Sequence, residues 1–229
     1  NNGTFKAYNT AAARVRTTAI NSGNKFTINN GVIYGENNLP PTGTTTASNQ
    51  SLAIYCKCKE LEINNGDITG VSTNGDNGWA LSSLAETYIN GGIFKGINSA
   101  ITPANLNGKF SNYTITGGSF YGVVHGGFYF QGDSSTKIII KNATIGNTSN
   151  WTNIDVSSFD RFGHFYIGTK RDVTYVYMDN CKIDRSEMKN IPVALSSNYN
   201  HKNTYLYVSN TDLGPVRVDG PNAAGDQGH

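Results

Sequence analysis

Apolar and polar side chains alternate along this chain in short stretches that recur about every 25 residues or somewhat more. Each copy has an alternating stretch, a turn of Asn and Gly, and a second apolar stretch. The alternation predicts β-strands, because a strand directs successive side chains to opposite sides. The clearest copies are Phe26–Gly35, Leu61–Gly70, Thr87–Gly96 and Tyr113–Gly122, and looser ones are Ile138–Asn147, Val176–Arg185 and Leu206–Pro215.

Alignment of the seven copies gives columns of related residues, which predicts that the copies stack on one another. The second core position of the first strand is Ile28, Ile63, Ile89, Ile115, Ile140, Met178 or Val208. The second strand begins with the core residue Ile33, Ile68, Phe94, Phe120, Ile145, Ile183 or Leu213. We expect each column to form a row of neighbouring side chains in one core.

The turn between these strands has a position that holds only Asn or Gly: Asn30, Asn65, Gly91, Gly117, Asn142, Asn180 and Asn210. Both residue types tolerate a left-handed backbone, so this column predicts a positive φ. The next column takes only small side chains: Gly31, Gly66, Gly92, Gly118, Ala143, Cys181 and Thr211. Small residues there predict close packing between copies.

A third strand precedes the first by roughly ten residues, at Trp79–Leu81, Phe128–Phe130, Phe165–Ile167 and Val193–Leu195, with weaker members at 52–55 and 100–101. Three parallel strands and one tight turn per repeat predict an all-β, right-handed parallel β-helix of about seven to eight coils. Two other repeat folds do not fit this pattern: leucine-rich repeats need helices, and propellers need blades of antiparallel strands. The arrangement resembles the pectate-lyase-like superfamily, including phage tailspike and tail-fibre domains, from Phe26 to about Val218.

The expected boundaries are residues 25–218 for the β-helix, 1–24 for an N-terminal cap or first irregular coil, and 219–229 for a C-terminal tail. Thr10–Ile20 is either a capping helix or a first strand, and the sequence leaves both open. Cys56 and Cys58 lie on one side of a strand, and we expect small buried hydrophobes there rather than half of a metal site.

Composition limits the classes of partner. The 229 residues carry a net charge of +2, and 15% are charged, which argues against nucleic-acid binding. No apolar run reaches the roughly 20 residues of a membrane helix, so no membrane insertion is expected. No acidic run is typical of a calcium site, so we expect neither a metal nor a cofactor.

Outward-facing aromatic residues on the third strand of the repeats, the one that precedes the first, predict a carbohydrate site. Tyr129 and Tyr166 should be neighbours on adjacent coils, with His164 also pointing outward. The insertion 147–161, with Trp151 and Arg161, should wall this surface. Trp79 has inward parity on the same strand type, which predicts a core position.

Polysaccharide cleavage would need two carboxylates about 5 to 9.5 Å apart, or a carboxylate with a base for elimination. The candidate catalytic residues are Asp133, Asp160, Asp172 and Glu187. The competing interpretation is that they are solvated loop residues, since loops hold most charges in any protein. His125 and His201 are isolated and are expected in loops or turns.

A second set of outward aromatics comprises Tyr175, Tyr177, Tyr205 and Tyr207. It is compatible with a carbohydrate platform, a subunit interface or simple stacking that stabilises the sheet.

The resemblance to tailspikes implies a homotrimeric receptor-binding domain for bacterial surface polysaccharide, in the virion tail or extracellular. The alternatives are a polysaccharide-degrading hydrolase or lyase, and a secreted adhesin or structural spacer, because this fold carries many functions.

Overall fold

The computed structural model of the protein describes residues 2–9, 17–18, 24–37, 51–72, 78–103, 112–132, 136–148, 151, 163–169, 174–187, 193–196 and 204–219. These residues are all-β, and no helix occurs among them. Their strands form four sheets in which neighbouring strands are parallel.

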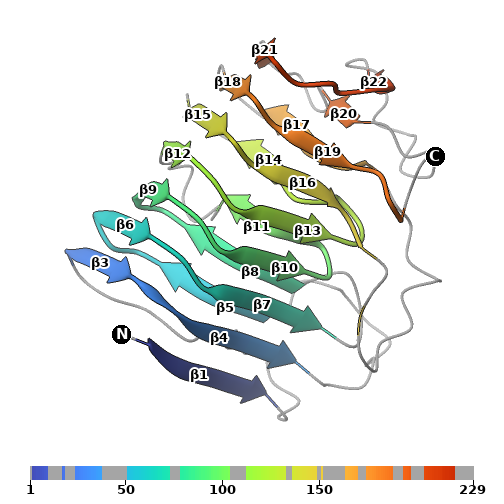
Figure 1. Ribbon diagram of the computed structural model, residues 1–229. Helices are drawn as coiled ribbons and strands as arrows, with labels where there is room; N and C mark the ends of the chain where they lie inside the picture. The colour runs from blue at the N-terminus through green and yellow to red at the C-terminus, as the bar shows by residue number, and fades with distance from the viewer. Residues whose placement is uncertain are drawn as a thin grey trace.

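The strands lie on three faces of the molecule (Figure 1). Face A is the sheet β1 (Asn2–Asn9), β4 (Asn30–Asn37), β7 (Asp67–Ser72), β10 (Ile93–Gly96), β13 (Ser119–Gly122), β16 (Thr144–Asn147) and β19 (Lys182–Asp184). Face C is the sheet β3 (Lys25–Ile28), β6 (Glu60–Ile63), β9 (Glu86–Ile89), β12 (Tyr113–Ile115), β15 (Thr136–Lys141), β18 (Thr174–Asp179) and β21 (Thr204–Ser209).

Face B consists of two four-stranded sheets. The first contains β2 (Thr17–Thr18), β5 (Ser51–Cys56), β8 (Gly78–Ser83) and β11 (Ser99–Pro103). The second contains β14 (Tyr129–Gly132), β17 (Tyr166–Thr169), β20 (Val193–Ser196) and β22 (Val216–Asp219). A parallel bridge between Ile101 and Phe128 joins them.

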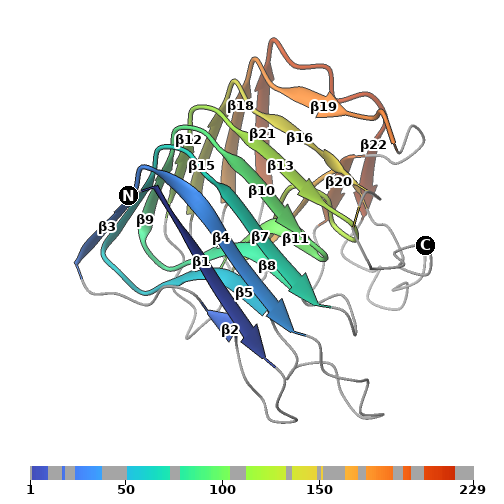
Figure 2. The ribbon, with the colours of Figure 1, turned by 60° about the horizontal axis from the view of Figure 1, so that its bottom comes forward.

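The chain visits the faces in the order A, B, C from β1 to β21, and each strand pairs with a strand of the preceding visit (Figure 2). We call one such passage a repeat. The register confirms the predicted column from Ile28 to Val208 on face C and the column from Ile33 to Ile183 on face A. Leu213 falls outside a strand but packs against the core.

All three faces contribute side chains to one core. Ile33 and Phe94 come from face A, Leu81 from face B, and Ile63 from face C, and each is at most 2% exposed. Phe94 stacks on Phe120 of the next repeat with ring centroids 4.9 Å apart. Identical positions in successive repeats therefore pack on one another, as parallel strand pairing requires.

The tight turns are of two kinds, which corrects the prediction of a single positive-φ column. In the last three turns the predicted Asn has a left-handed backbone, with φ of 53° at Asn142, 51° at Asn180 and 48° at Asn210. In the first four turns the positive φ falls one residue later, on the glycines Gly31, Gly66, Gly92 and Gly118, at 105° to 143°. Such values lie beyond the left-handed helical region that Asn tolerates, so these turns require Gly.

Amide side chains beside these turns are hydrogen-bonded from repeat to repeat. Asn64 Nδ2 donates to Asn29 Oδ1 at 2.9 Å, and Asn90 Nδ2 donates to Asn64 Oδ1 at 2.8 Å. Asn180 Nδ2 donates to Asn142 Oδ1 at 2.8 Å. The asparagines thus link adjacent repeats as well as shaping the turns.

Two strands are described in the N-terminal region, for which the sequence predicted a cap or a first irregular coil. β1 pairs with β4 along its whole length, and β2 pairs with β5. Thr17 and Thr18 are therefore in a strand, which contradicts the capping helix at these two positions; the rest of Thr10–Ile20 lies outside the described residues. Phe5 pairs with Ile33 and Ala7 pairs with Gly35, so Phe5 and Ala7 occupy the inward positions of β1. This alternating stretch is short, so its sequence signal is weak.

Two expectations for face B are met, each with a feature that the sequence did not indicate. Cys56 and Cys58 are buried as predicted, and they also form a disulfide. Trp79 is buried, but it packs with Leu52 and Tyr55 in a small cluster separate from the main core. Strands β5 and β8 are buried on both sides. The alternation of side chains along β8 therefore predicts burial of Trp79 but not the cluster that it joins.

Candidate functional site

The predicted neighbours Tyr129 and Tyr166 are directly paired. They face each other in the register of β14 and β17 on face B, although they are 37 residues apart in the sequence. The side chain of Tyr129 is half-buried, and that of Tyr166 lies outside the described residues. The repeat therefore brings these two positions together, as the strand columns predict.

His125 packs against this tyrosine. The ring centroids of His125 and Tyr129 are 4.2 Å apart, and His125 Nδ1 lies 3.0 Å from Asn98 Oδ1. Because the amide oxygen is an acceptor, we assign the proton to Nδ1, which leaves Nε2 with its lone pair. Burial lowers the pKa of His125 to about 3, so the imidazole is neutral at physiological pH.

Backbone contacts between repeats fix this corner, where the chain passes from face A to face B. The amide of His125 donates to the carbonyl of Asn98 at 2.8 Å, and the amide of Gly127 donates to the carbonyl of His164 at 2.9 Å. Gly126 has a φ of 68°, and a Cβ there would overlap the His164 carbonyl. The sequence His-Gly-Gly is therefore needed to seat the imidazole beside Tyr129.

His164 does not lie on the outer surface, contrary to the prediction. Its side chain is 0% exposed. It belongs to the bend before β17 rather than to the strand, so strand parity does not apply to it. A ligand lying over Tyr129 therefore meets His125, which the sequence analysis assigned to a loop or turn, and not His164.

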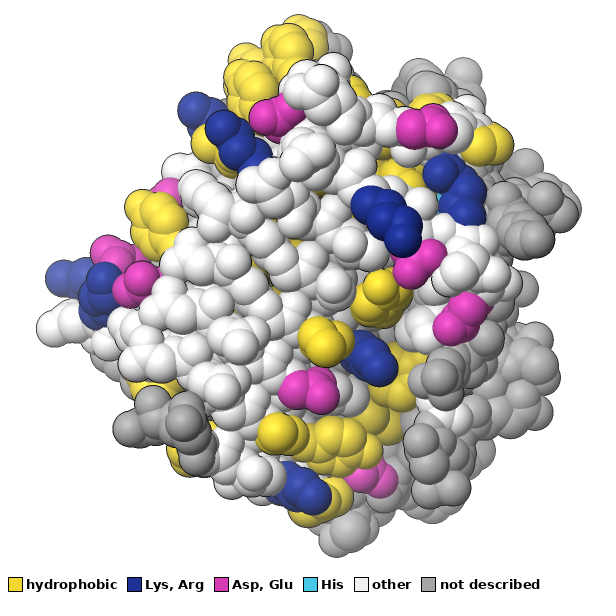
Figure 3. Space-filling view, in the orientation of Figure 1, with side chains coloured by type: hydrophobic (Ala, Val, Ile, Leu, Met, Phe, Trp, Pro, Cys, Tyr) yellow, Lys and Arg dark blue, Asp and Glu magenta, His cyan; other side chains and the backbone are white. Residues whose placement is uncertain are grey.

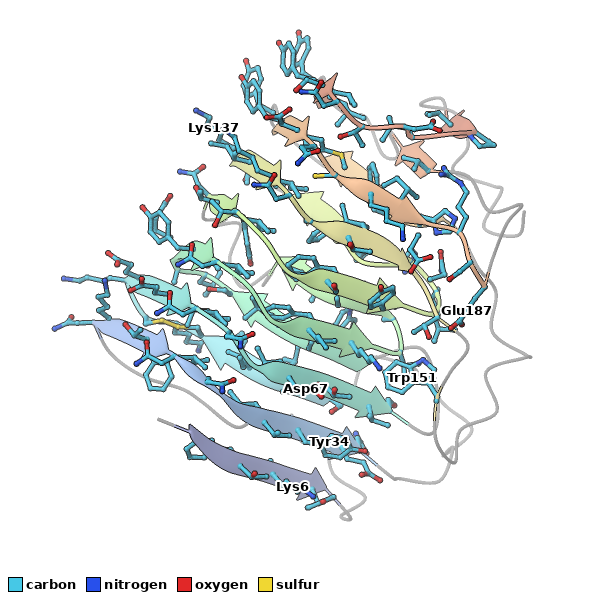
Figure 4. All side chains as sticks on the ribbon, viewed as in Figure 1. Lys6, Tyr34, Asp67, Lys137, Trp151 and Glu187 are labelled. Atoms are coloured by element: carbon cyan, nitrogen blue, oxygen red, sulfur yellow. A yellow bond between two sulfur atoms is a disulfide. The ribbon has the colours of Figure 1, made fainter. Side chains whose placement is uncertain are left out.

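Trp151 and Glu187 lie on the side of the molecule where the face A strands end (Figure 4). Trp151 is half-buried and packs against Ile97 and Val123, two residues of the same corner. Glu187 is exposed and follows β19. The predicted wall residue Trp151 thus covers the corner that carries His125, while Glu187 is open to solvent.

The other predicted site residues, Asp133, Asp160, Arg161 and Asp172, lie outside the described residues. Glu187 is the one described member of the predicted carboxylate set. Within the described ranges, no group of three or more His, Cys, Asp or Glu side chains is placed to hold a metal ion. Nor does a helix long and apolar enough to cross a membrane occur in this part of the chain.

A second aromatic surface lies at the C-terminal end of face C. Tyr177 and Tyr207 stack with ring centroids 4.8 Å apart and planes 8° apart, and Tyr175 and Tyr205 do so at 5.3 Å and 10°. All four are exposed, as predicted. Lys137 Nζ lies 5.4 Å from the Tyr177 ring centroid. One face of each ring meets its stacking partner, so each pair offers less ring area to a ligand than two separate tyrosines would.

Face A has a mixed outer surface, without one large patch of a single charge (Figure 3). Its most specific contact joins Tyr121 to Asp184 two repeats away, with the hydroxyl donating to Oδ2 at 3.2 Å. Gly146 lies between them in the register and leaves room for the tyrosine. Burial, and then the nearby charge of Asp184, raise the pKa of Tyr121. We interpret this contact as structural, because it satisfies both polar groups.

Asn98 and His125 were not among the site residues predicted from the sequence. Each follows a face A strand by a few residues, in Gly-Ile-Asn-Ser and Gly-Val-Val-His, so the columns that end at Gly96 and Gly122 point to this corner. No family model, curated protein or solved structure matches this chain.

Proposed function

We propose that the chain is a right-handed parallel β-helix of the pectate-lyase-like type and a tailspike-like receptor-binding domain for bacterial surface polysaccharide. The proposed fold is supported by the A, B, C order of the parallel strands and by the hydrogen bonds between asparagine side chains beside the tight turns. The functional part extends to a homotrimer located in a virion tail or outside the cell, as the resemblance implies.

The observation that carries the binding proposal is the packing of His125 on Tyr129 at 4.2 Å, with Asn98 beside the imidazole. An aromatic ring beside a neutral imidazole supplies an apolar surface together with a hydrogen-bonding group, and the buried amide of Asn98 orients that imidazole. Such a combination is typical of sites for neutral polar ligands. A sugar ring offers the matching C–H face and hydroxyl groups.

The position on face B supports this assignment. Trp151 covers Ile97 and Val123 at the same corner, and the backbone hydrogen bonds between repeats hold His125 in place. A rigid scaffold limits the ordering cost of binding an extended chain. By contrast, the tyrosines of face C are stacked on one another, which reduces the ring area available to a sugar.

The test is a panel of capsular and O-antigen polysaccharides, with affinity measured by calorimetry and chain length followed by size-exclusion chromatography. Tyr166→Ala and Tyr129→Ala should weaken binding by about 1 to 3 kcal/mol, by analogy with stacking on other flat ligands. Tyr88→Ala, on face C, is the matched control and should bind as the parent does. Binding without shortening supports a receptor-binding domain, whereas shortening supports the enzyme.

A further inference from the structure

Several turns and strands of this protein contain asparagine followed directly by glycine. In that sequence the glycine nitrogen can attack the asparagine side chain and release its amide, because glycine has no Cβ to hinder the approach. Four such pairs lie within the described residues, namely Asn2–Gly3, Asn30–Gly31, Asn65–Gly66 and Asn90–Gly91. The fold holds these pairs in different ways, so their reactivities should differ.

At Asn65–Gly66 neither of the two reacting groups is held. The side chain of Asn65 is exposed and makes no hydrogen bond with any described residue. The backbone amide of Gly66, between β6 and β7, likewise donates to no described residue. The position beside Asn65 in the next repeat is Gly91, which has no side chain to cover it. The side-chain amide is thus free to turn toward the Gly66 nitrogen.

Asn90–Gly91 lies in the turn of the next repeat, one position earlier, and its side chain is held at both ends. Asn90 Nδ2 donates to Asn64 Oδ1 at 2.8 Å, and Asn90 Oδ1 accepts from Thr116 Oγ1 at 3.0 Å. Rotation of the amide toward the Gly91 nitrogen would break both hydrogen bonds. The fold therefore protects this pair, although its sequence is as reactive as that of Asn65–Gly66.

The other two pairs lie in strands rather than in turns. Asn2–Gly3 belongs to β1 and Asn30–Gly31 to β4, and the two pairs are neighbours in the parallel register of these strands. Strand pairing limits the backbone rotation that closure of a ring between side chain and main chain requires. Asn65 is therefore the least restrained of the four asparagines.

We infer that Asn65 is a site of spontaneous deamidation in the folded protein. The Gly66 nitrogen loses its proton to a base in the solvent and bonds to Asn65 Cγ, and the Cγ–Nδ2 bond breaks as ammonia leaves. The product is a cyclic succinimide. Water then opens the ring at Cγ, which gives aspartate, or at the main-chain carbonyl carbon of Asn65, which gives isoaspartate. The sum consumes one water, releases one ammonia and involves no oxidation.

The isoaspartate product changes the turn as well as its charge. Its main chain runs through Cβ and Cγ, which adds one carbon directly before Gly66. The Gly66 carbonyl accepts a hydrogen bond from the amide of Ile93 in the next repeat at 2.7 Å, and Gly66 has a φ of 143°. An added carbon displaces this contact between repeats. Deamidated protein should therefore unfold at a lower urea concentration than Asn65→Asp, which has the new charge without the added carbon.

The experiment measures the rate of deamidation of each pair by peptide mapping with mass spectrometry. The full chain is incubated in mildly alkaline buffer, once folded and once unfolded in urea. The unfolded sample gives the rate that the local sequence sets, and the ratio of the unfolded to the folded rate gives the protection by the fold. This ratio should be at least about tenfold larger for Asn90 than for Asn65, the factor that corresponds to one net hydrogen bond.

Two variants test the cause of the difference. The double substitution Asn64→Ala and Thr116→Ala removes both hydrogen-bond partners of Asn90, and it should bring the folded-state rate of Asn90 close to that of Asn65. Asn65→Gln should abolish the fast reaction, because the longer side chain would have to close a larger ring. Urea unfolding of each variant shows that it is folded.

Equal protection of Asn65 and Asn90 in the parent would overturn the inference. So would an unmodified Asn65 in the folded protein after a time in which the unfolded chain has reacted. A folded double variant in which Asn90 reacts as slowly as in the parent would also contradict it. If the double variant does not fold, the comparison of Asn65 with Asn90 in the parent decides the question.

Discussion

Asn180 donates a hydrogen bond from Nδ2 to Oδ1 of Asn142 in the preceding repeat at 2.8 Å, and both residues have left-handed φ angles, 51° and 53°. One residue type thus meets two requirements at this turn. Its backbone reverses the chain between faces C and A, and its side chain links one repeat to the next.

Replacement of Asn180 should separate these two contributions. Asn180→Val should lower the free energy of unfolding by at least about 1 kcal/mol, because a β-branched residue is disfavoured at positive φ. Asn180→Gly keeps the backbone conformation and loses only the side-chain hydrogen bond, so it should cost less. Urea denaturation measures both. Equal stability of the valine variant and the parent would contradict the assigned turn geometry.

In the first four turns, substitution of the glycine should lower the stability of the protein more than substitution of the residue before it. Gly66 has a φ of 143°, and a Cβ there would lie 3.0 Å from the Gly31 carbonyl oxygen. Gly66→Ala should therefore cost about 1 to 3 kcal/mol. Its matched control is the exposed neighbour Asn65→Ala, for which we expect a change within about 0.5 kcal/mol. A larger loss of stability for Asn65→Ala than for Gly66→Ala, in thermal or urea unfolding, would contradict the assignment of the positive φ to the glycine.

His125 should make stability depend on pH. Its pKa of about 3 in the folded protein is below the unfolded value of about 6.5, so the unfolded chain binds a proton first as the pH falls. The contribution of neutral His125 is fully present above pH about 6.5 and is lost progressively toward pH 3. The slope is at most about 1.4 kcal/mol per pH unit.

His125→Gln should remove this part of the pH dependence while keeping a polar side chain beside Asn98. Urea unfolding of the parent and of this variant at a series of pH values between 7 and about 4 gives the difference. Parallel stability curves for the two proteins would mean that His125 titrates alike in the folded and unfolded states.

The stacked pair Tyr177 and Tyr207 should show a measurable coupling energy. A double-mutant cycle with Tyr177→Ala and Tyr207→Ala should give about 0.5 to 1.5 kcal/mol, as parallel aromatic pairs do beyond their buried area. The cycle of Tyr88 with Tyr207 should give none, because three strands separate them on face C. A coupling near zero for the stacked pair would contradict a contribution of this stacking to sheet stability.

The strand columns were predictable because one simple signal repeats. Ile63, Ile89 and Ile115 recur at the same phase, and parallel pairing converts that phase directly into contacts. Tyr129 lies beside Tyr166 for the same reason. Where the repeat is regular, sequence spacing and three-dimensional position carry the same information.

The remaining features depend on interactions that do not repeat. His164 is buried because the chain bends before β17, and Trp79 joins a separate cluster because β5 and β8 are covered on both sides. The disulfide between Cys56 and Cys58 forms between residues two apart, for which strand parity indicated only a shared side. His125 was missed because its partner Asn98 lies in the previous repeat, outside any local motif.

The central claim, that polysaccharide binds over face B, is tested most directly by hydrogen exchange with mass spectrometry. The protein is compared alone and with the capsular or O-antigen polysaccharide that binds best in the panel. The account predicts slower exchange in segment 123–131 and in β17, with little change in β18 and β21. Protection confined to the Tyr177 and Tyr207 strands, or no protection by any polysaccharide, would contradict it.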